Sequence, residues 1–170
     1  MKTPKLTHER LLELLHYDPE TGVFTWRVDR WRGRGMGVLA AAAGSVAGSV
    51  NGDGYVCIKI DGENHKAHRL ARFYVTGEWP RAMVDHRDLD RSNNRYDNLR
   101  NATRGQNRAN STSKNKHGFK GVAKVRGRYM AQIRKDKKNI NLGYFDSAAE
   151  AGAIYDTAAK GVHGEFARVK

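Results

Sequence analysis

The chain has 170 residues, enough for one ordinary domain or two small ones, and carries a formal net charge of +13. The basic excess is spread along the whole length, which favours a long polyanion as partner over a merely basic surface. A single cysteine, Cys57, excludes a disulfide framework and a zinc knuckle, and no run reaches the length of a membrane span. Because the N-terminus has no signal-peptide core, we expect an intracellular protein with no membrane partner and no structural zinc.

The first stretch is expected to be scaffold. Thr7 caps a predicted helix over residues 8–16, in which four leucines form an apolar face. Residues 18–22 have the composition of a turn, and residues 23–26 that of a strand.

The following stretch is basic at first and then rich in small residues. Residues 27–37 indicate either an arm that lies against DNA phosphate or a mobile loop. Residues 38–50 are rich in Ala, Gly and Ser and are predicted to be a linker that enters a strand at its end. Alternation over residues 55–60, between two glycine turns, predicts a hairpin strand, and residues 68–76 predict a helix. His68, at the start of that helix, is interpreted as a structural histidine, and the alternative is that it approaches the phosphate.

Residues 84–110 are the stretch around which the chain is organised. An apolar strand ends in an acid and a histidine, a polar loop of turn-forming residues follows, and a second short strand leads to a helix. Thr103 and Gln106 have the spacing of a capping box, which predicts where the helix begins. Four polar side chains stand at the junctions of these elements: Asp85, His86, Asn98 and Asn107.

This stretch resembles the ββα-metal (His-Me finger) core of the HNH nucleases, in the variant found in phage and intron-type homing endonucleases. The resemblance implies that His86 is the general base and that Asn98 ties the two strands together. It also implies that Asp85 and Asn107 hold one divalent cation. Many relatives carry His where this chain has Asn107, and an amide oxygen favours Mg²⁺ or Mn²⁺ over a softer metal. The competing interpretation is that these residues are ordinary loop polars.

The C-terminal third has a second pattern. Residues 119–126, 128–135 and 139–145 alternate as three strands, with tight turns at Gly127 and at residues 136–138. Ser147 caps a predicted helix that runs to about Val162 and buries its alanines and Ile154 against the sheet.

This pattern is similar to the APETALA/ethylene-response-factor DNA-binding domain over nearly all of residues 117–167. In that family the three-stranded sheet lies in the major groove of DNA, which is wide enough to admit β-strands. The family's tryptophans are missing here, so its target sequence does not transfer. The resemblance implies DNA contacts by six side chains: Lys120, Lys124, Arg126, Arg128, Gln132 and Arg134.

Together these patterns predict an α+β protein with a ββα-metal nuclease module at 1–110, a linker at 111–116, and a three-stranded antiparallel sheet packed on one helix at 117–170. The expected function is metal-dependent, sequence-targeted cleavage of double-stranded DNA by a homing-type HNH endonuclease, encoded by a phage or mobile element and acting in the cytoplasm of a bacterial host. A catalytically inactive DNA-binding regulator and an RNA-binding protein are the alternatives. Monomer and homodimer are both compatible with the sequence.

Overall fold

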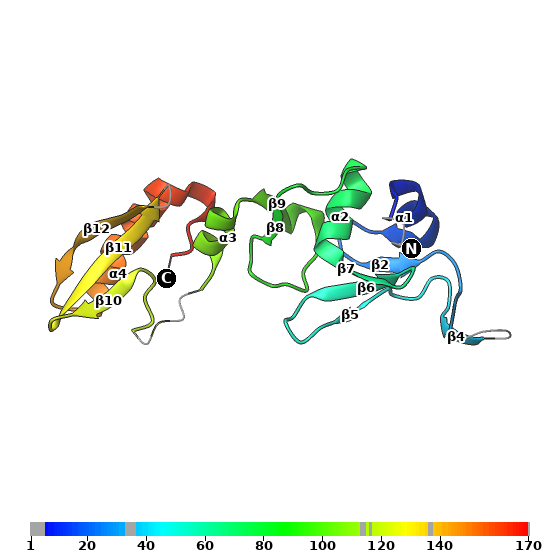
Figure 1. Ribbon diagram of the computed structural model, residues 1–170, viewed down its shortest axis with the longest axis horizontal. Helices are drawn as coiled ribbons and strands as arrows, with labels where there is room; N and C mark the ends of the chain where they lie inside the picture. Colours follow the sequence, from blue (N-terminus) through cyan, green and yellow to red (C-terminus); the bar gives the residue numbers. More distant parts are fainter. Residues whose placement is uncertain (1–5, 33–36, 113–114, 116, 136–137, 170) are drawn as a thin grey trace. The chain divides into compact units, whose positions relative to one another are not determined.

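The computed structural model describes residues 6–32, 37–112, 115, 117–135 and 138–169. The chain divides into two compact units, Met1–Ala102 and Thr103–Lys170. Each unit contains helices and small antiparallel sheets (Figure 1), which is consistent with the expected α+β class. The division falls between the second strand and the helix of the expected nuclease core, earlier than the sequence predicts. In the described part of the chain, no helix combines the length and apolar character needed to cross a bilayer.

The first unit opens with α1 (His8–Leu14), and the Thr7 hydroxyl accepts a hydrogen bond from the Arg10 N–H at 3.2 Å, as the capping prediction requires. β1 (Leu15–Tyr17) then pairs antiparallel with β2 (Phe24–Trp26). The predicted end of the first helix is therefore wrong. Leu15 takes an extended conformation because Leu15 and Tyr17 enter the core with the alternation of a strand.

A small hairpin follows, formed by β3 (Arg30–Arg32) and β4 (Val38–Ala41). The basic stretch thus contains a strand, and residues 33–36 lie outside the described residues. Trp31 is 65% exposed on this hairpin. The predicted linker over residues 38–50 is wrong in part, because it contains β4 and the buried Ala47.

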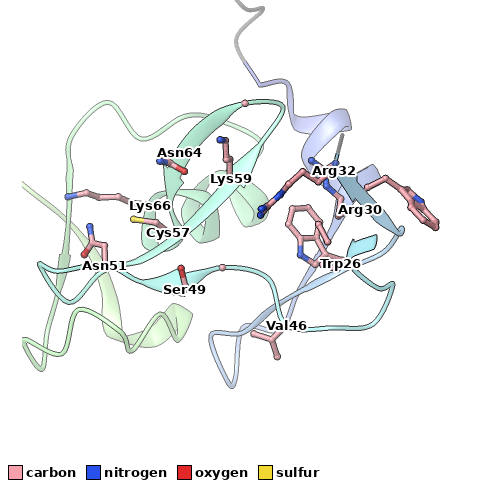
Figure 2. A pocket seen from close by; sticks show the side chains of 15 residues that line it. Trp26, Arg30, Arg32, Val46, Ser49, Asn51, Cys57, Lys59, Asn64 and Lys66 are labelled. Atoms are coloured by element: carbon pink, nitrogen blue, oxygen red, sulfur yellow. The ribbon is translucent and has the colours of Figure 1, made fainter. Parts of the chain in front are cut away.

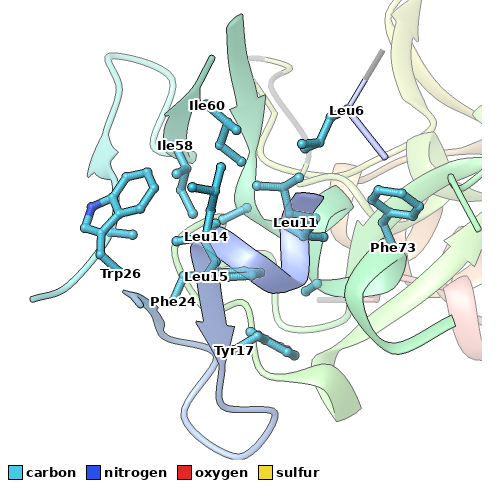
Figure 3. Packing of buried hydrophobic residues seen from close by; sticks show 14 of the residues in the cluster. Leu6, Leu11, Leu14, Leu15, Tyr17, Phe24, Trp26, Ile58, Ile60 and Phe73 are labelled. Carbon is cyan, nitrogen blue, oxygen red and sulfur yellow. The ribbon is translucent and has the colours of Figure 1, made fainter. Parts of the chain in front are cut away.

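A three-stranded antiparallel sheet comes next, with β5 (Ser49–Val50), β6 (Val56–Ile60) and β7 (Glu63–Lys66) in that order. It leads directly into α2 (Ala67–Thr76). The core of the unit lies between α1, α2 and the sheet (Figure 3), and its largest fully buried side chains are Leu11, Leu15, Ile58, Ile60 and Leu70. Each such aliphatic side chain contributes about 1.5–3 kcal/mol on burial, so this core fixes the scaffold against which the next strands form.

The first unit ends with a two-stranded ribbon. β8 (Met83–His86) pairs antiparallel with β9 (Leu99–Ala102), and the 3₁₀ turn η1 (Tyr96–Asn98) precedes β9. Val84 and Leu99 join the apolar core and so anchor both strands.

The second unit begins with α3 (Arg104–Asn110), whose capping box is present as predicted: the Gln106 N–H donates to the Thr103 hydroxyl, and the Thr103 N–H donates to the Gln106 side chain. β10 (Val122–Val125), β11 (Arg128–Lys135) and β12 (Lys138–Phe145) then form an antiparallel sheet. Of the turn predicted at residues 136–138, residues 136–137 lie outside the described residues and Lys138 is the first residue of β12.

α4 (Ala148–His163) begins at its predicted cap, Ser147, and the short turn η2 (Gly164–Phe166) follows it. Tyr155 and Ala159 of α4 share a core cluster with Ile133 of the sheet. Ile154, predicted to be buried, is 41% exposed. The packed face of α4 repeats at helical spacing through Ala151, Tyr155 and Ala159, and Ile154 lies off that stripe.

Candidate active site

The β8–β9 ribbon buries the predicted acid and base together. Asp85 is 5% exposed and His86 4% exposed. Asp85 pairs with Arg100 across the ribbon and His86 with Leu99. β8 ends at His86, and Leu89 takes a left-handed conformation in the turn that follows (φ 72°). The chain thus turns away directly after these two side chains.

His86 is oriented by Asn94, a residue to which the sequence analysis gave no role. The Asn94 amide nitrogen donates to the Ser92 carbonyl at 3.0 Å, so its Oδ1 is the atom that lies 3.3 Å from His86 Nε2. A neutral imidazole can bond to a carbonyl-type oxygen only as a donor, which places the proton on Nε2 and the lone pair on Nδ1. Burial lowers the pKa of His86, although the hydrogen bond that His86 donates to Asn94 opposes that shift. A neutral imidazole near pH 7 is the form that a general base needs.

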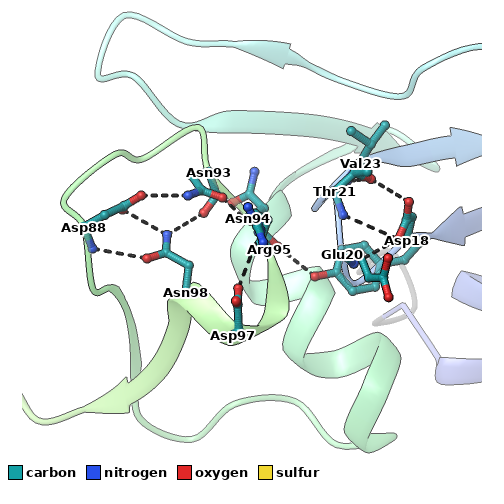
Figure 4. Close-up of polar contacts among 11 residues, drawn as sticks. Asp18, Glu20, Thr21, Val23, Asp88, Asn93, Asn94, Arg95, Asp97 and Asn98 are labelled. Carbon is teal, nitrogen blue, oxygen red and sulfur yellow. Dashed lines mark hydrogen bonds and ion pairs between the residues drawn. The ribbon is translucent and has the colours of Figure 1, made fainter.

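Asn98 fastens the loop between the two strands (Figure 4). Its amide nitrogen donates to Asp88 Oδ1 and to the Asn93 carbonyl, both at 2.9 Å, and its Oδ1 accepts from the Asp88 N–H at 3.1 Å. Asn93 adds a bond to the second oxygen of Asp88 at 2.7 Å. One buried amide therefore holds both ends of the loop that begins directly after His86.

The N-terminal turn supports the same loop from the other side. The Tyr17 hydroxyl donates to the Asn94 carbonyl at 2.7 Å, and the Tyr96 N–H donates to the Pro19 carbonyl at 3.0 Å. Gly22 has φ +75°, and a Cβ there would lie 2.4 Å from the Arg95 nitrogen. The segment read as scaffold is thus in direct contact with the residues that orient His86.

Arg100 is the partner of the predicted metal ligand. Its Nε donates to Asp85 Oδ2 at 3.0 Å, and both side chains are buried. A buried carboxylate needs a compensating positive charge, and here a guanidinium supplies it. A divalent cation could share the carboxylate with the guanidinium, because an ionised carboxyl group has two oxygens and about four acceptor sites.

Asn107 lies in the first turn of α3, where its N–H donates to the Thr103 carbonyl at 3.0 Å. Asp85 belongs to the first unit and Asn107 to the second. Within the described residues, no group of three or more His, Cys, Asp or Glu side chains could hold a metal. Asp85 offers carboxylate oxygens and Asn107 an amide oxygen, and oxygen donors are the ligands that hard cations such as Mg²⁺ prefer.

Two aromatic side chains extend the site beyond the sequence motif. His68, at the start of α2, is buried, and its ring centroid lies 4.9 Å from that of His86 in an edge-to-face arrangement. Burial lowers the pKa of His68 to about 3, so it stays neutral beside His86. The Tyr55 ring lies 5.2 Å from His68 and 6.1 Å from His86. The interpretation of His68 as a purely structural residue is thus too narrow, because it contacts the predicted base.

In the second unit, the six predicted DNA-binding side chains do not share one surface. Lys120 donates to the Arg108, Ala109 and Ser111 carbonyls at the end of α3, and burial lowers its pKa to about 8. Its amine is therefore committed within the protein, as a cap for that helix.

The other five divide by strand register. Lys124 pairs with Tyr129, whose ring packs against the core cluster beneath α4, so Lys124 lies on the helix side of the sheet. Arg126 lies in the β10–β11 turn with φ 48°. Arg128, Gln132 and Arg134 alternate with the buried Ala131 and Ile133 and so lie on the opposite, open face of β11.

Comparison with known proteins bears on the first unit and α3. Residues 65–109 match the family model of the HNH endonucleases. A protein of Acanthamoeba polyphaga mimivirus, named as an uncharacterised HNH endonuclease, is 36% identical over 105 residues, which cover 58% of this chain and 55% of the relative. The chain thus spans about half the length of that relative. The family match ends at residue 109, so the APETALA-type resemblance of the C-terminal unit stays a prediction.

Proposed function

We propose that this protein is a metal-dependent, sequence-targeted endonuclease of the homing type that hydrolyses double-stranded DNA. The observation that carries the proposal is the bond between His86 and Asn94, which sets the tautomer of a buried, neutral imidazole. His86 Nδ1 takes a proton from the attacking water, and Asn98 holds the loop on which this geometry depends. Asp85 and Asn107 are the residues that would hold one Mg²⁺ or Mn²⁺, which supplies positive charge to the phosphate and the leaving oxygen.

The second unit is proposed to bring DNA to this site. Arg128, Gln132 and Arg134 present two cations and an amide along one face of β11, a pattern suited to phosphate and base edges in a groove. Tethering such a surface to the nuclease raises the local concentration of DNA at a catalytic core that itself contacts few bases. Arg128 also bonds to Asp146 at 3.1 Å, so Arg134 is the more available of the two cations.

Supercoiled plasmid gives the direct test. The full-length protein should convert plasmid to nicked or linear form with Mg²⁺ and lose that activity in EDTA. His86→Ala should lower the rate by about 10²–10⁴-fold, the usual contribution of a general base. His16→Ala, an exposed histidine on β1, is the matched control and should cleave normally.

Three outcomes would contradict the proposal. DNA binding without cation-dependent cleavage by the wild-type protein would favour the inactive regulator. Cleavage that survives in His86→Ala would remove this residue as the base. Full displacement of bound duplex by an equal amount of RNA would favour an RNA-binding protein, and mapping cleavage sites on genomic DNA tests the sequence preference.

A further inference from the structure

Tyr55 stands beside the predicted base and has no part in the mechanism above. It precedes β6, and its N–H donates to Asn51 Oδ1 at 2.9 Å, which fixes the turn that carries it. Its half-buried ring contacts both histidines of the site. Tyr55 therefore connects the β5–β6 turn to the surroundings of His86.

Two cations lie against this ring. Lys66 Nζ is 3.8 Å from the ring centroid of Tyr55, and Arg91 Cζ is 5.0 Å from it. The Arg91 guanidinium also donates to the Asp53 carbonyl at 2.7 Å, which holds it at the same turn. In the described part of the chain, neither cation forms an ion pair with a carboxylate. The electron-rich face of the ring attracts each cation but cannot neutralise their mutual repulsion, whereas one anion bound to both would do so.

The same lysine also lines a groove. A hollow of about 1200 Å³ runs over the β5–β6–β7 sheet to the β3–β4 hairpin (Figure 2). Its lining includes Arg30, Arg32, Lys59 and Lys66, and among the residues that the structure describes it contains no Asp or Glu. Lys66 is moreover the N-cap of α2, where the positive end of the helix dipole adds to the charge on its side chain. A chain of phosphates lying along this groove would end beside Tyr55 and thus next to the predicted base.

We propose that Lys66 and Arg91, held against Tyr55, form a binding site for one phosphate of the DNA strand that enters the active site. The choice of DNA as the ligand rests on the proposed function. Arg91 offers the planar fork that suits phosphate oxygens, and Lys66 adds a point charge. The Tyr55 ring keeps both cations in place before the strand arrives, so less side-chain freedom is lost on binding.

The salt dependence of DNA binding tests this site. Fluorescence anisotropy of the full-length protein with a fluorescein-labelled duplex, in EDTA and at a series of KCl concentrations, gives the slope of log K against log salt. Lys66→Met and Arg91→Met should each reduce that slope by up to about 0.9, the contribution of one phosphate contact to B-DNA. Because the two cations share one phosphate, the slope should also fall by about 0.9 in the double variant, and not by about 1.8, the value for two separate phosphate contacts.

Matched variants separate the role of the ring from a loss of folding. Tyr55→Phe keeps the ring and should keep the wild-type slope, whereas Tyr55→Leu should behave like the cation variants. Lys160→Met, which removes an exposed lysine of α4, should leave the slope unchanged. Tryptophan fluorescence confirms that each variant is folded, because all three tryptophans lie in the first unit.

The outcomes distinguish this inference from the proposed function. Unchanged slopes in Lys66→Met and Arg91→Met would overturn the phosphate site even if plasmid is cleaved. If the slope falls by about 1.8 in the double variant, the two cations do not share one phosphate. If the slopes fall as expected while the wild-type protein never cleaves DNA, the phosphate site stands and the nuclease proposal fails.

Discussion

Arg100→Met would remove the positive partner of the buried Asp85 while keeping a long apolar side chain in place. In the wild-type protein the Arg100 Nε lies 3.0 Å from Asp85 Oδ2, and both residues lie at one paired position of the β8–β9 ribbon. The variant leaves a carboxylate with its ion-pair partner removed in a site where only 5% of the residue surface meets solvent. We expect the first unit to lose about 3–5 kcal/mol of unfolding free energy, the usual result of removing one partner of a buried pair.

The double variant Asp85→Leu/Arg100→Met supplies the magnitude check. Replacing both partners by apolar groups of similar size is often neutral or stabilising, since no charge is then left buried. The double variant should therefore be close to wild type in stability, well above Arg100→Met alone. Because Asp85 is a proposed metal ligand, the double variant should also be inactive on plasmid, which separates stability from catalysis.

Urea unfolding followed by tryptophan fluorescence measures this, and it reports on the first unit alone because Trp26, Trp31 and Trp79 all belong to it. A loss below about 1 kcal/mol in Arg100→Met, the value typical of an exposed pair, would refute the buried ion pair. So would additive losses in the double variant, because contacting residues in one charge pair are expected to couple.

Three further predictions concern single positions. Gly22→Ala should slow cleavage by up to about 10²-fold, because its Cβ displaces the backbone beside Asn94; Gly44→Ala has the same left-handed backbone but no neighbour within 4 Å and is the control. The acid limb of kcat/KM against pH should lie below 6.5, because burial lowers the pKa of His86 from that value. The hydrogen bond to Asn94 raises the pKa of His86, so Asn94→Leu, which removes that bond, should move the acid limb to a still lower pH. An acid limb above pH 6.5 in the wild-type protein would contradict the assignment of His86 as the base. Lys120→Met should destabilise the end of α3 by about 1–3 kcal/mol, because the Arg108, Ala109 and Ser111 carbonyls lose their charged donor. Amide hydrogen exchange measures this change, with Lys124→Met as the control.

The order of elements at the site could be predicted from sequence because its signals are local. The Thr103–Gln106 box and the Ser147 cap each depend on residues three positions apart, and both are present. The glycine turn at Asp61 and Gly62 predicted the β6–β7 hairpin for the same reason. Side-chain type and spacing settle such features before any tertiary contact forms.

The partners of the site residues could not be predicted, because they depend on register and on distant segments. Arg100 meets Asp85 only because β8 and β9 pair without a shift. The contact of Tyr17 with the Asn94 carbonyl spans 77 residues and has no signature in either segment. The sequence does not distinguish Lys120 from other basic residues, because its amine reaches the end of α3 only through the packing of the second unit.

At His68 the residue that is best for stability differs from the residue that is present. Its Nδ1 is buried without a hydrogen-bond partner in the described residues, which costs about 1–3 kcal/mol relative to a satisfied group. A position selected for stability alone would carry an apolar side chain, so a polar residue retained in contact with His86 points to a role in the site.

His68→Leu makes this argument testable. Between pH 6.5 and about 3 the unfolded chain binds the proton that folded His68 excludes, so wild-type stability should fall by about 1.4 kcal/mol per unit as pH drops through that window. The variant should lack that part of the pH dependence, be at least as stable as wild type at pH 7, and cleave DNA more slowly because His86 loses its edge-to-face neighbour. His16→Leu, exposed on β1, should change neither property. A variant that is less stable at pH 7 but cleaves at the wild-type rate would show that His68 serves the core and not the base.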